Sequence, residues 1–433
     1  MIMINKSHRY PRFTLMNQDI PLAEIDDEEG IIQVIDKNQA FLPYGLQKNN
    51  LRFRDFERWA ANRALVLSRS NAKKILNVCH LDQTDRYETA KACRLLMVDD
   101  CFWIREQENE KWEQFDLKKN SLSKAISQLA LNGEYITISG DIFSAELTTH
   151  GAHAKCWQRD KELYLYKKSG NYFESEKELL VSEILECLDI PHISYYPTQN
   201  PSVCKCKCMV DDDKYRLNYG EFEEYCRNHN QNAVQRVKEI NPVLFYQMNV
   251  IDYLIANTDR HNGNWGFFVD AKTNAITDLH PLYDHNNAFD PCFNDKVGSI
   301  VMEGYSMMDA AIYAQDIIHL NLEPAKEIPK SRFELLQIDY NAFLTRLNTI
   351  QYGRKNNIKQ SETYSVADIV LDGYINEIDT YQKLTVYLNE NQPALAKDRL
   401  SIEEYIEKNI PDLYKEKIRE YYSMQAEEDY ELE

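Results

Sequence analysis

The most informative part of the sequence is Asn257-Thr258-Asp259-Arg260-His261-Asn262-Gly263-Asn264, a polar stretch between two apolar segments. The preceding residues 243–255 are apolar and predict a helix, and a strand is expected to begin at Trp265. The polar residues therefore form a loop between two buried elements.

A hairpin is predicted directly after this loop. Residues 267–269 and 276–279 are expected to pair, because residues 270–275 read as a turn. The two strands of a hairpin start and end at the same edge, so Asn264 should lie next to Asp284 although the two are far apart in sequence. A carboxamide and a carboxylate are hard oxygen ligands that suit Mg²⁺ when a nucleotide supplies phosphate oxygens.

Asp259 completes the pattern, since it precedes Asn264 by five residues. This order is that of protein-kinase-like sites, in which the first Asp acts on the acceptor hydroxyl and the other two residues hold the metal. His261 lies in the same loop, where it either takes part in catalysis or hydrogen-bonds the loop into shape. Taken alone, the stretch is also compatible with an ordinary Asx-rich turn. Its agreement with the hairpin and Asp284 favours the catalytic interpretation.

Two blocks carry a resemblance to a known family: residues 259–264, with Asp-Arg-His-x-x-Asn, and residues 283–286, with Tyr-Asp-His-Asn. They resemble the HipA-like kinases, in particular the CtkA-like branch, whose active sites are akin to those of phosphoinositide kinases. The resemblance implies an α+β fold with the two lobes of a protein kinase. It also implies ATP and Mg²⁺ as cofactors and transfer of the γ-phosphate to serine or threonine hydroxyls of a protein substrate, with autophosphorylation.

The resemblance extends to a loop upstream, which in the family ends in Gly-x-Gln-x-Lys. Residues 148–155 match it, with Gly151 at the glycine and His153 in place of Gln. Both are expected to contact the nucleotide phosphates. Thr148 occupies the position of a serine that is autophosphorylated in family toxins, although Thr148 could also be an ordinary turn residue.

A strand lysine and a helix glutamate follow in the expected order. Lys167 matches the lysine that binds the nucleotide phosphates, and Glu178 matches its ion-pair partner, which together would fix a positive charge at the phosphates. Lys168 remains an alternative to Lys167. The run of residues 203–209 resembles the strand that leads to the interlobe hinge, so adenine is expected near Met209.

Metal sites of other kinds are less well supported. Cys204, Cys206 and Cys208 alternate as on one face of a strand, and no CxxC pair accompanies them, which disfavours zinc. His280 and His285 flank Asp284, but carboxylate, carboxamide and phosphate oxygens suit Mg²⁺ better than a transition metal. No Walker-type phosphate loop is present.

Changes in hydrophobic period divide the chain into three parts. Residues 1–130 are expected to form a mainly helical domain with a short strand-containing entry segment, and helical spacing extends from residue 56 to about residue 129. Residues 131–210 are the expected N-lobe, and residues 211–433 the helical C-lobe with an acidic C-terminal tail.

The composition narrows the possible partners and locations. The net charge of −19 disfavours nucleic-acid binding, and no long apolar run or signal-peptide core is present, so we expect a cytoplasmic protein without membrane insertion. The oligomeric state is left open. Two alternatives to a protein kinase also stay open: a kinase for small molecules or lipid headgroups, and a non-catalytic nucleotide-binding scaffold.

Overall fold

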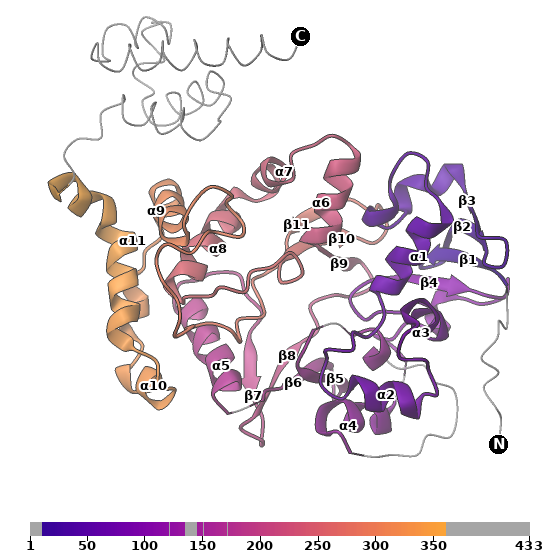
Figure 1. Ribbon diagram of the computed structural model, residues 1–433, viewed down its shortest axis with the longest axis horizontal. Helices are drawn as coiled ribbons and strands as arrows, with labels where there is room; N and C mark the ends of the chain where they lie inside the picture. Colours follow the sequence, from indigo (N-terminus) through magenta and orange to yellow (C-terminus); the bar gives the residue numbers. More distant parts are fainter. Residues whose placement is uncertain (1–10, 121, 135–144, 150, 171, 361–433) are drawn as a thin grey trace, which may run out of the picture. The chain divides into compact units, whose positions relative to one another are not determined.

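The computed structural model describes residues 11–120, 122–134, 145–149, 151–170 and 172–360 (Figure 1). The chain divides into two compact units, residues 1–351 and 352–433, and the site discussed below lies in the first. The predicted acidic tail lies outside the described residues. In the part that is described, no helix combines the length and the apolar character that a membrane span needs.

The N-terminal part contains an antiparallel sheet as well as helices. Its strands lie in the order β3-β2-β1-β4. The strand β4 falls in a stretch for which the sequence predicts helices, and it is a strand because its buried Phe102, Trp103 and Ile104 pair with β1, which lies far away in sequence. The elements of this part are β1 (Arg12–Asn17), β2 (Ile20–Asp26), β3 (Ile31–Val34), α1 (Phe53–Asn62), α2 (Ala72–Val78), α3 (Arg86–Ala92), β4 (Phe102–Arg105) and α4 (Lys124–Asn132).

A second antiparallel sheet follows, in the order β5-β6-β8-β7, with one helix beside it. Cys204 and Cys206 of β8 are buried, whereas Lys205 lies over the ring of Tyr164 at 4.6 Å, so the alternation expected of a strand is observed. The elements are β5 (Ala154–Arg159), β6 (Leu163–Lys168), α5 (Tyr172–Cys187), β7 (Tyr195–Pro197) and β8 (Val203–Lys207).

The predicted hairpin is confirmed, and a third strand extends it. Phe267 pairs with Leu279 and Val269 with Ile276. Only glycine fits at the start of this hairpin, because a Cβ on Gly266 would lie 2.0 Å from the carbonyl oxygen of Leu217 in the neighbouring strand. The three strands, in the order β11-β10-β9, are β9 (Lys214–Asn218), β10 (Gly266–Asp270) and β11 (Ile276–Leu279).

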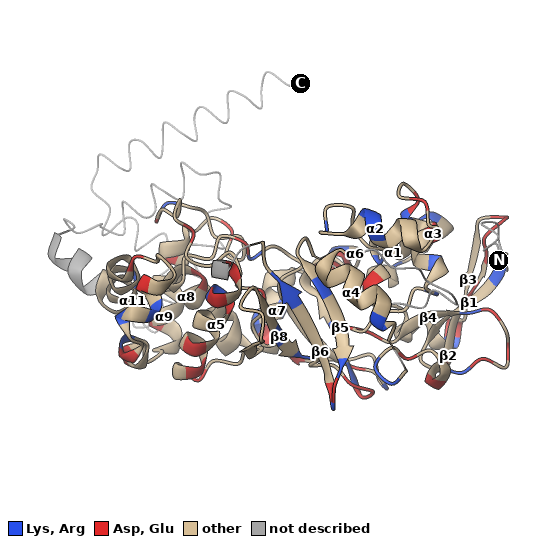
Figure 2. Ribbon diagram, turned by 90° about the horizontal axis from the view of Figure 1, so that it is seen from below, with Lys and Arg blue, Asp and Glu red and all other residues tan. Residues whose placement is uncertain are grey.

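Helices form the rest of the described chain. The helix before the polar loop begins where the Asn241 side chain accepts a hydrogen bond from Leu244 N at 2.9 Å, with Pro242 in the first turn. In Figures 1 and 2, α8, α9 and α11 gather at the end opposite to β1–β4, with the other two sheets between them. The helices are α6 (Tyr219–Asn228), α7 (Ala233–Ile240), α8 (Pro242–Leu254), α9 (Met307–Ile318), α10 (Lys330–Leu335) and α11 (Tyr340–Gln360).

One hydrophobic core runs through these layers. It includes Phe13 and Trp103 of the N-terminal sheet, Phe267 of the hairpin and Phe245 of α8. A smaller separate cluster joins α2 and α4, with Ile75 and Leu129 among its members. The N-terminal part therefore packs on the hairpin that carries the candidate site.

Candidate active site

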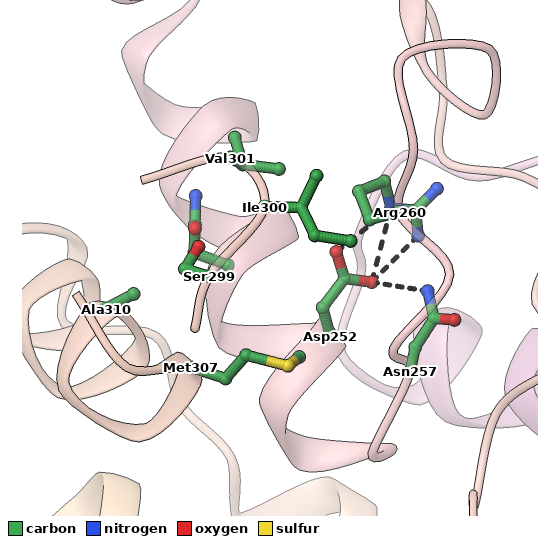
Figure 3. A pocket seen from close by; sticks show the side chains of 9 residues that line it. Asp252, Asn257, Arg260, Ser299, Ile300, Val301, Met307 and Ala310 are labelled. Carbon is green, nitrogen blue, oxygen red and sulfur yellow. Dashed lines mark hydrogen bonds and ion pairs between the residues drawn. The ribbon is translucent and has the colours of Figure 1, made fainter. Parts of the chain in front are cut away.

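A buried ion pair shapes the polar loop that follows α8. The Arg260 guanidinium donates to both carboxylate oxygens of Asp252, at 2.8 and 2.9 Å, and Asn257 donates to the same carboxylate at 2.9 Å (Figure 3). Arg260 Nη1 also donates to the carbonyl oxygens of Asn264, at 2.8 Å, and Tyr283, at 3.0 Å. One side chain thus joins the end of the loop to the residue before Asp284.

Behind this ion pair lies a cavity of about 10 Å³, which is room for about one water molecule. Asp252 and Arg260 form its polar wall, and Ile300, Val301 and Met307 form an apolar one (Figure 3). The loop therefore rests on a nearly filled interior, which fixes its backbone.

Asn264 is hydrogen-bonded to Asp259, and Asp259 is hydrogen-bonded to the segment that follows the hairpin. The Asn264 amide nitrogen donates to the carbonyl oxygen of Asp259 at 2.9 Å, so its amide oxygen is the atom that could ligate a cation. One carboxylate oxygen of Asp259 accepts from the Asn287 amide at 2.8 Å. Asn287 lies three residues beyond Asp284, so the loop and the second block meet here.

Lys167 of β6 contacts α5 and the segment after β11. Its ammonium donates to Glu178 of α5 and to Asp284 after the hairpin. Lys167 and Glu178 are only 4% and 1% exposed, so the contact is largely shielded from solvent. The three residues come from β6, α5 and the segment after β11, and the fold brings them together.

The charges of this group stabilise one another. Burial alone would lower the pKa of Lys167, but Asp284 and Glu178 outweigh it and raise that pKa above its usual value. Burial likewise disfavours the Asp284 carboxylate, yet Lys167 and then Lys155 hold its pKa well below the usual range. Burial raises the pKa of Glu178. Asp284 is therefore an anion, as a ligand for a cation must be.

Asp284 also has an unusual backbone. Its φ of 60° lies in the left-handed region, which residues other than glycine adopt rarely. Such conformations persist where the surrounding structure holds them and are frequent at functional sites. Arg260, which binds the carbonyl of the preceding Tyr283, is one such restraint.

Lys155, which ends the upstream loop matched to Gly-x-Gln-x-Lys, is a further cation at this site, although the sequence analysis gave it no role of its own. It pairs with Lys167 across β5 and β6, and it is 7% exposed. Within the described residues, no carboxylate lies at ion-pairing distance from its ammonium. Burial, opposed in part by Asp284, lowers the pKa of Lys155 to about 8. The lysine that ends the matched loop and its cross-strand pairing with Lys167 are the signals that could have revealed a role for Lys155.

The glycine of the upstream loop makes room for this ammonium. The φ of Gly151 is 101°, which strains any residue with a side chain, and a Cβ there would lie 2.2 Å from Lys155 Nζ and displace the ammonium. His153, at the other end of the turn, lies with Nε2 2.7 Å from the Asn286 amide nitrogen. Burial, then Lys167, lowers the pKa of His153, which fits a neutral ring that accepts this hydrogen bond. The loop is thus tied to the segment after Asp284.

The remaining predicted residues are less closely involved. Thr148 is 1% exposed, and its hydroxyl donates to the carbonyl of Leu96 at 2.6 Å. His261 is exposed, and its Nδ1 accepts from Gly263 N at 3.1 Å, a contact within the loop. Met209 lies just after β8 and is partly exposed. Lys168, the alternative to Lys167, lies 3.4 Å from Asn132 at an exposed position and does not contact Asp284.

The donors present fit Mg²⁺ rather than a transition metal. Asp284 is ionised and Asn264 offers an amide oxygen, which are the hard ligands that Mg²⁺ uses beside phosphate oxygens. His280 and His285 are buried, and the His280 ring packs against Phe268 at 4.6 Å. Within the described ranges, no group of three or more His, Cys, Asp or Glu residues is placed to hold a metal ion.

The sequence of this chain has a partial match among known proteins. No protein-family model matches the chain. The serine/threonine-protein kinase CtkA of Helicobacter pylori strain J99 is 36% identical over 69 residues, which cover 16% of this chain and 21% of that protein. The match therefore spans about a fifth of the length of this relative.

Solved structures give a broader likeness. HipA of the Shewanella oneidensis MR-1 toxin–antitoxin system, in complex with HipB and operator DNA, superposes with a TM-score of 0.52 at 11% identity, over 81% of this chain and 100% of that chain. The chain has the fold of the HipA-like kinases. A crystal structure of the Helicobacter pylori proinflammatory kinase CtkA also matches, with a TM-score of 0.37 at 15% identity, over 50% of this chain and 95% of that chain.

The HipA-like fold confirms the predicted fold class. The partial sequence match to CtkA agrees with the suspected relationship. The polar loop, the hairpin and the strand lysine belong to one kinase-like framework. The roles of the individual residues stay predictions at this point.

Proposed function

We propose that this protein is an ATP- and Mg²⁺-dependent kinase that phosphorylates serine or threonine hydroxyls of a protein. The observation that carries the proposal is the contact of Lys167 with both Glu178 and Asp284. This contact places the buried Lys167 ammonium of one lobe beside the Asp284 carboxylate of the other. A metal-bound triphosphate needs both, because the cation binds its phosphates and the carboxylate binds its metal ion. The partial likeness to the serine/threonine-protein kinase CtkA supports the choice of acceptor.

The residues divide into three roles. Lys167 and Lys155 bind the phosphates, and Glu178 keeps Lys167 in place. Asn264 and Asp284 hold Mg²⁺, which when bound neutralises charge on the phosphate oxygens. Asp259 orients the acceptor hydroxyl, and its hydrogen bond from Asn287 fixes the direction in which the carboxylate points.

The proposed reaction is an in-line transfer. The acceptor oxygen forms a bond to the γ-phosphorus while the bond from that phosphorus to the β–γ bridging oxygen breaks, and ADP leaves. The hydroxyl proton passes to the Asp259 carboxylate. Lys167 and Lys155 stay in place and stabilise the negative charge on the phosphates throughout.

Autophosphorylation is part of the proposal, with Thr148 as the candidate acceptor. Because the Thr148 hydroxyl is buried and donates to Leu96, the segment 145–149 would have to leave its position before Thr148 could react. We therefore expect autophosphorylation of Thr148 to be slow compared with transfer to an external protein.

The decisive experiment is incubation of the purified protein with Mg²⁺ and ATP, followed by intact mass and phosphopeptide analysis. The variants are Asp259→Asn, Asp284→Asn and Lys167→Met. Asp278→Asn is the matched control, because Asp278 lies exposed on β11 of the same hairpin, and its carboxylate accepts from the Asn241 amide at 2.7 Å and from Leu279 N at 2.7 Å. We expect phosphate on the wild type and on the control, and none on the other three.

The alternatives predict other results. A small-molecule or lipid-headgroup kinase would consume ATP in the presence of such an acceptor but phosphorylate no protein. A nucleotide-binding scaffold would bind ATP, and Asp284→Asn would weaken binding, without turnover under any condition. Absence of Mg²⁺-dependent ATP binding would contradict the assignment of the site itself.

A further inference from the structure

A chain of side-chain contacts connects the N-terminal part with the candidate site. Arg216 of β9 lies at its centre. Its guanidinium donates to Asp99 at 2.6 Å and to the Tyr283 hydroxyl at 2.7 Å, and its backbone nitrogen donates to the Asp99 carbonyl at 2.8 Å. The guanidinium carbon also lies 5.2 Å from the centre of the Tyr283 ring. Arg216 thus makes two contacts with Asp99 and two with Tyr283.

Tyr283 carries these contacts into the site. Its hydroxyl, which accepts from Arg216, donates to the carbonyl oxygen of Gly263 at 2.9 Å. Gly263 precedes Asn264, and Tyr283 precedes Asp284, so one hydroxyl bridges the backbone next to both predicted metal ligands. Arg260, which donates to the carbonyls of Asn264 and Tyr283, connects the same two segments through a second side chain.

Asp99 is itself firmly placed. It precedes Asp100, whose carboxylate accepts two hydrogen bonds from Arg63 of the N-terminal part, at 2.7 and 2.8 Å. Arg63 also donates to the carbonyl of Leu95 at 2.9 Å. Asp99, where this series of contacts begins, therefore belongs to the N-terminal part and not to either of the expected kinase lobes.

We propose that Asp99, Arg216 and Tyr283 are positioning residues, through which the N-terminal part of the chain holds Asn264 and Asp284 in place for phosphoryl transfer. This inference rests on the proposed function. Transfer depends on sub-ångström placement of the reacting groups, so a small shift of these ligands lowers the rate even when the fold is intact. The N-terminal part is then a component of the catalytic apparatus and not an appended module.

The chain offers a matched control for the Tyr283 hydroxyl. Tyr44 is also 8% exposed, like Tyr283, and its hydroxyl also ties the N-terminal part to the sheet β9–β11. It donates to the carbonyl of Asn274 at 2.8 Å, however, which lies in the turn at the far end of the hairpin. The two tyrosines differ in which end of the hairpin they hold.

The experiment measures kcat, the KM for ATP and the melting temperature of full-length wild type, Tyr283→Phe, Tyr44→Phe, Asp99→Asn and the double variant Asp99→Asn/Tyr283→Phe. We expect Tyr283→Phe to lower kcat about tenfold, because it removes the hydroxyl that accepts from Arg216 and donates to Gly263, with KM within about twofold of wild type. Tyr44→Phe should lower the melting temperature and leave kcat within about twofold. The double variant should lose no more than the more affected single variant, because both act through one chain of contacts.

Equal kcat values for Tyr283→Phe and wild type would overturn the inference, and so would equal losses of kcat in Tyr283→Phe and Tyr44→Phe. Fully additive effects of Asp99→Asn and Tyr283→Phe would contradict the connection through Arg216. A wild type that transfers no phosphate would overturn the proposed function and this inference with it, whereas an active wild type with an unaffected Tyr283→Phe variant would overturn the inference alone.

Discussion

Lys155 and Lys167 face each other across neighbouring strands, and they differ in their partners. Lys167 has two carboxylates, whereas Lys155 is buried without an ion pair to any described residue. Burying an unpaired ammonium costs free energy of folding, and that cost is retained at sites where a charge is needed for a ligand. We therefore expect Lys155 to bind an anionic ligand.

Lys155→Met should raise the melting temperature at pH 7 while weakening ATP binding. The pKa of Lys155 falls from 10.5 to about 8 on folding, so the cost of burying its charge is fully present below pH 8. Between pH 8 and 10.5 the unfolded chain binds more protons than the native one, and the cost fades. The gain in melting temperature, about 1–2 °C for each kcal/mol in a unit of this size, should hence shrink as the pH rises.

ATP binding supplies the second half of this test. Since Lys155 loses its charge above about pH 8, the affinity of the wild type for ATP, measured by calorimetric titration, should fall between pH 7 and 9. The Lys155→Met variant should show a weaker affinity with a flatter pH dependence. Lys168→Met is the control and should bind ATP like wild type. A lowered melting temperature for Lys155→Met would mean that Lys155 is a structural residue.

At the scale of elements, the loop after α8 depends on one buried ion pair. Arg260→Ala should cost about 3–5 kcal/mol of unfolding free energy, because it leaves the Asp252 carboxylate buried and unpaired. Activity should be lost as well, since Arg260 also binds the carbonyls of Asn264 and Tyr283. Urea unfolding measures the first effect and phosphoryl transfer the second. The control Arg236→Ala removes an exposed pair with Glu239 and should cost less than about 1 kcal/mol.

The far end of the hairpin is held by Asn274. Its amide donates to the carbonyls of Ala40 and Leu42, at 2.8 and 3.1 Å, and its oxygen accepts from the Tyr215 hydroxyl at 2.6 Å. Asn274→Ala removes the acceptor of the buried Tyr215 hydroxyl and one hydrogen bond to each carbonyl, although both carbonyls also accept from the Gln47 amide, so we expect a loss of about 1–3 kcal/mol in urea unfolding. Thr273→Ala, in the same turn but exposed, should change stability by less than about 0.5 kcal/mol. Similar losses in both would show that the turn as a whole, not the Asn274 contacts, is responsible.

The hairpin also shows what the sequence can and cannot specify. Its two strands could be predicted because alternation and turn residues are local signals, and the observed pairing of Phe267 with Leu279 agrees. The third strand β9 and the strand β4 could not, because their partners lie far away in sequence and only tertiary packing selects them. For the same reason the sequence indicated Asp259, Asn264 and Asp284 but gave no sign of Asn287 or of the contact between Asp99 and Arg216.

At the scale of the whole molecule, one core joins the N-terminal sheet to the helical end. Phe13 of β1 and Phe245 of α8 belong to the same buried cluster, whereas Ile75 and Leu129, of α2 and α4, belong to another. The N-terminal sheet and the helical end do not differ in the sign of their charge either, because Lys and Arg are interspersed with Asp and Glu along the ribbon in Figure 2. Elements that share a core unfold together, and elements packed in a small satellite cluster can open alone.

Hydrogen exchange in the native protein should therefore give the same unfolding free energy for amides of β1 and of α8, and a lower one for amides of α2 and α4. Saturating MgATP should raise the shared value by about 2.7 kcal/mol at a hundredfold excess over the dissociation constant, because only the native state binds it. Amides of β11, which also contribute Leu279 to the shared core, are the internal reference. If β1 exchanged at a lower free energy than α8, the N-terminal sheet would open independently, and Asp99 would then be attached to a part of the molecule too mobile to hold Tyr283.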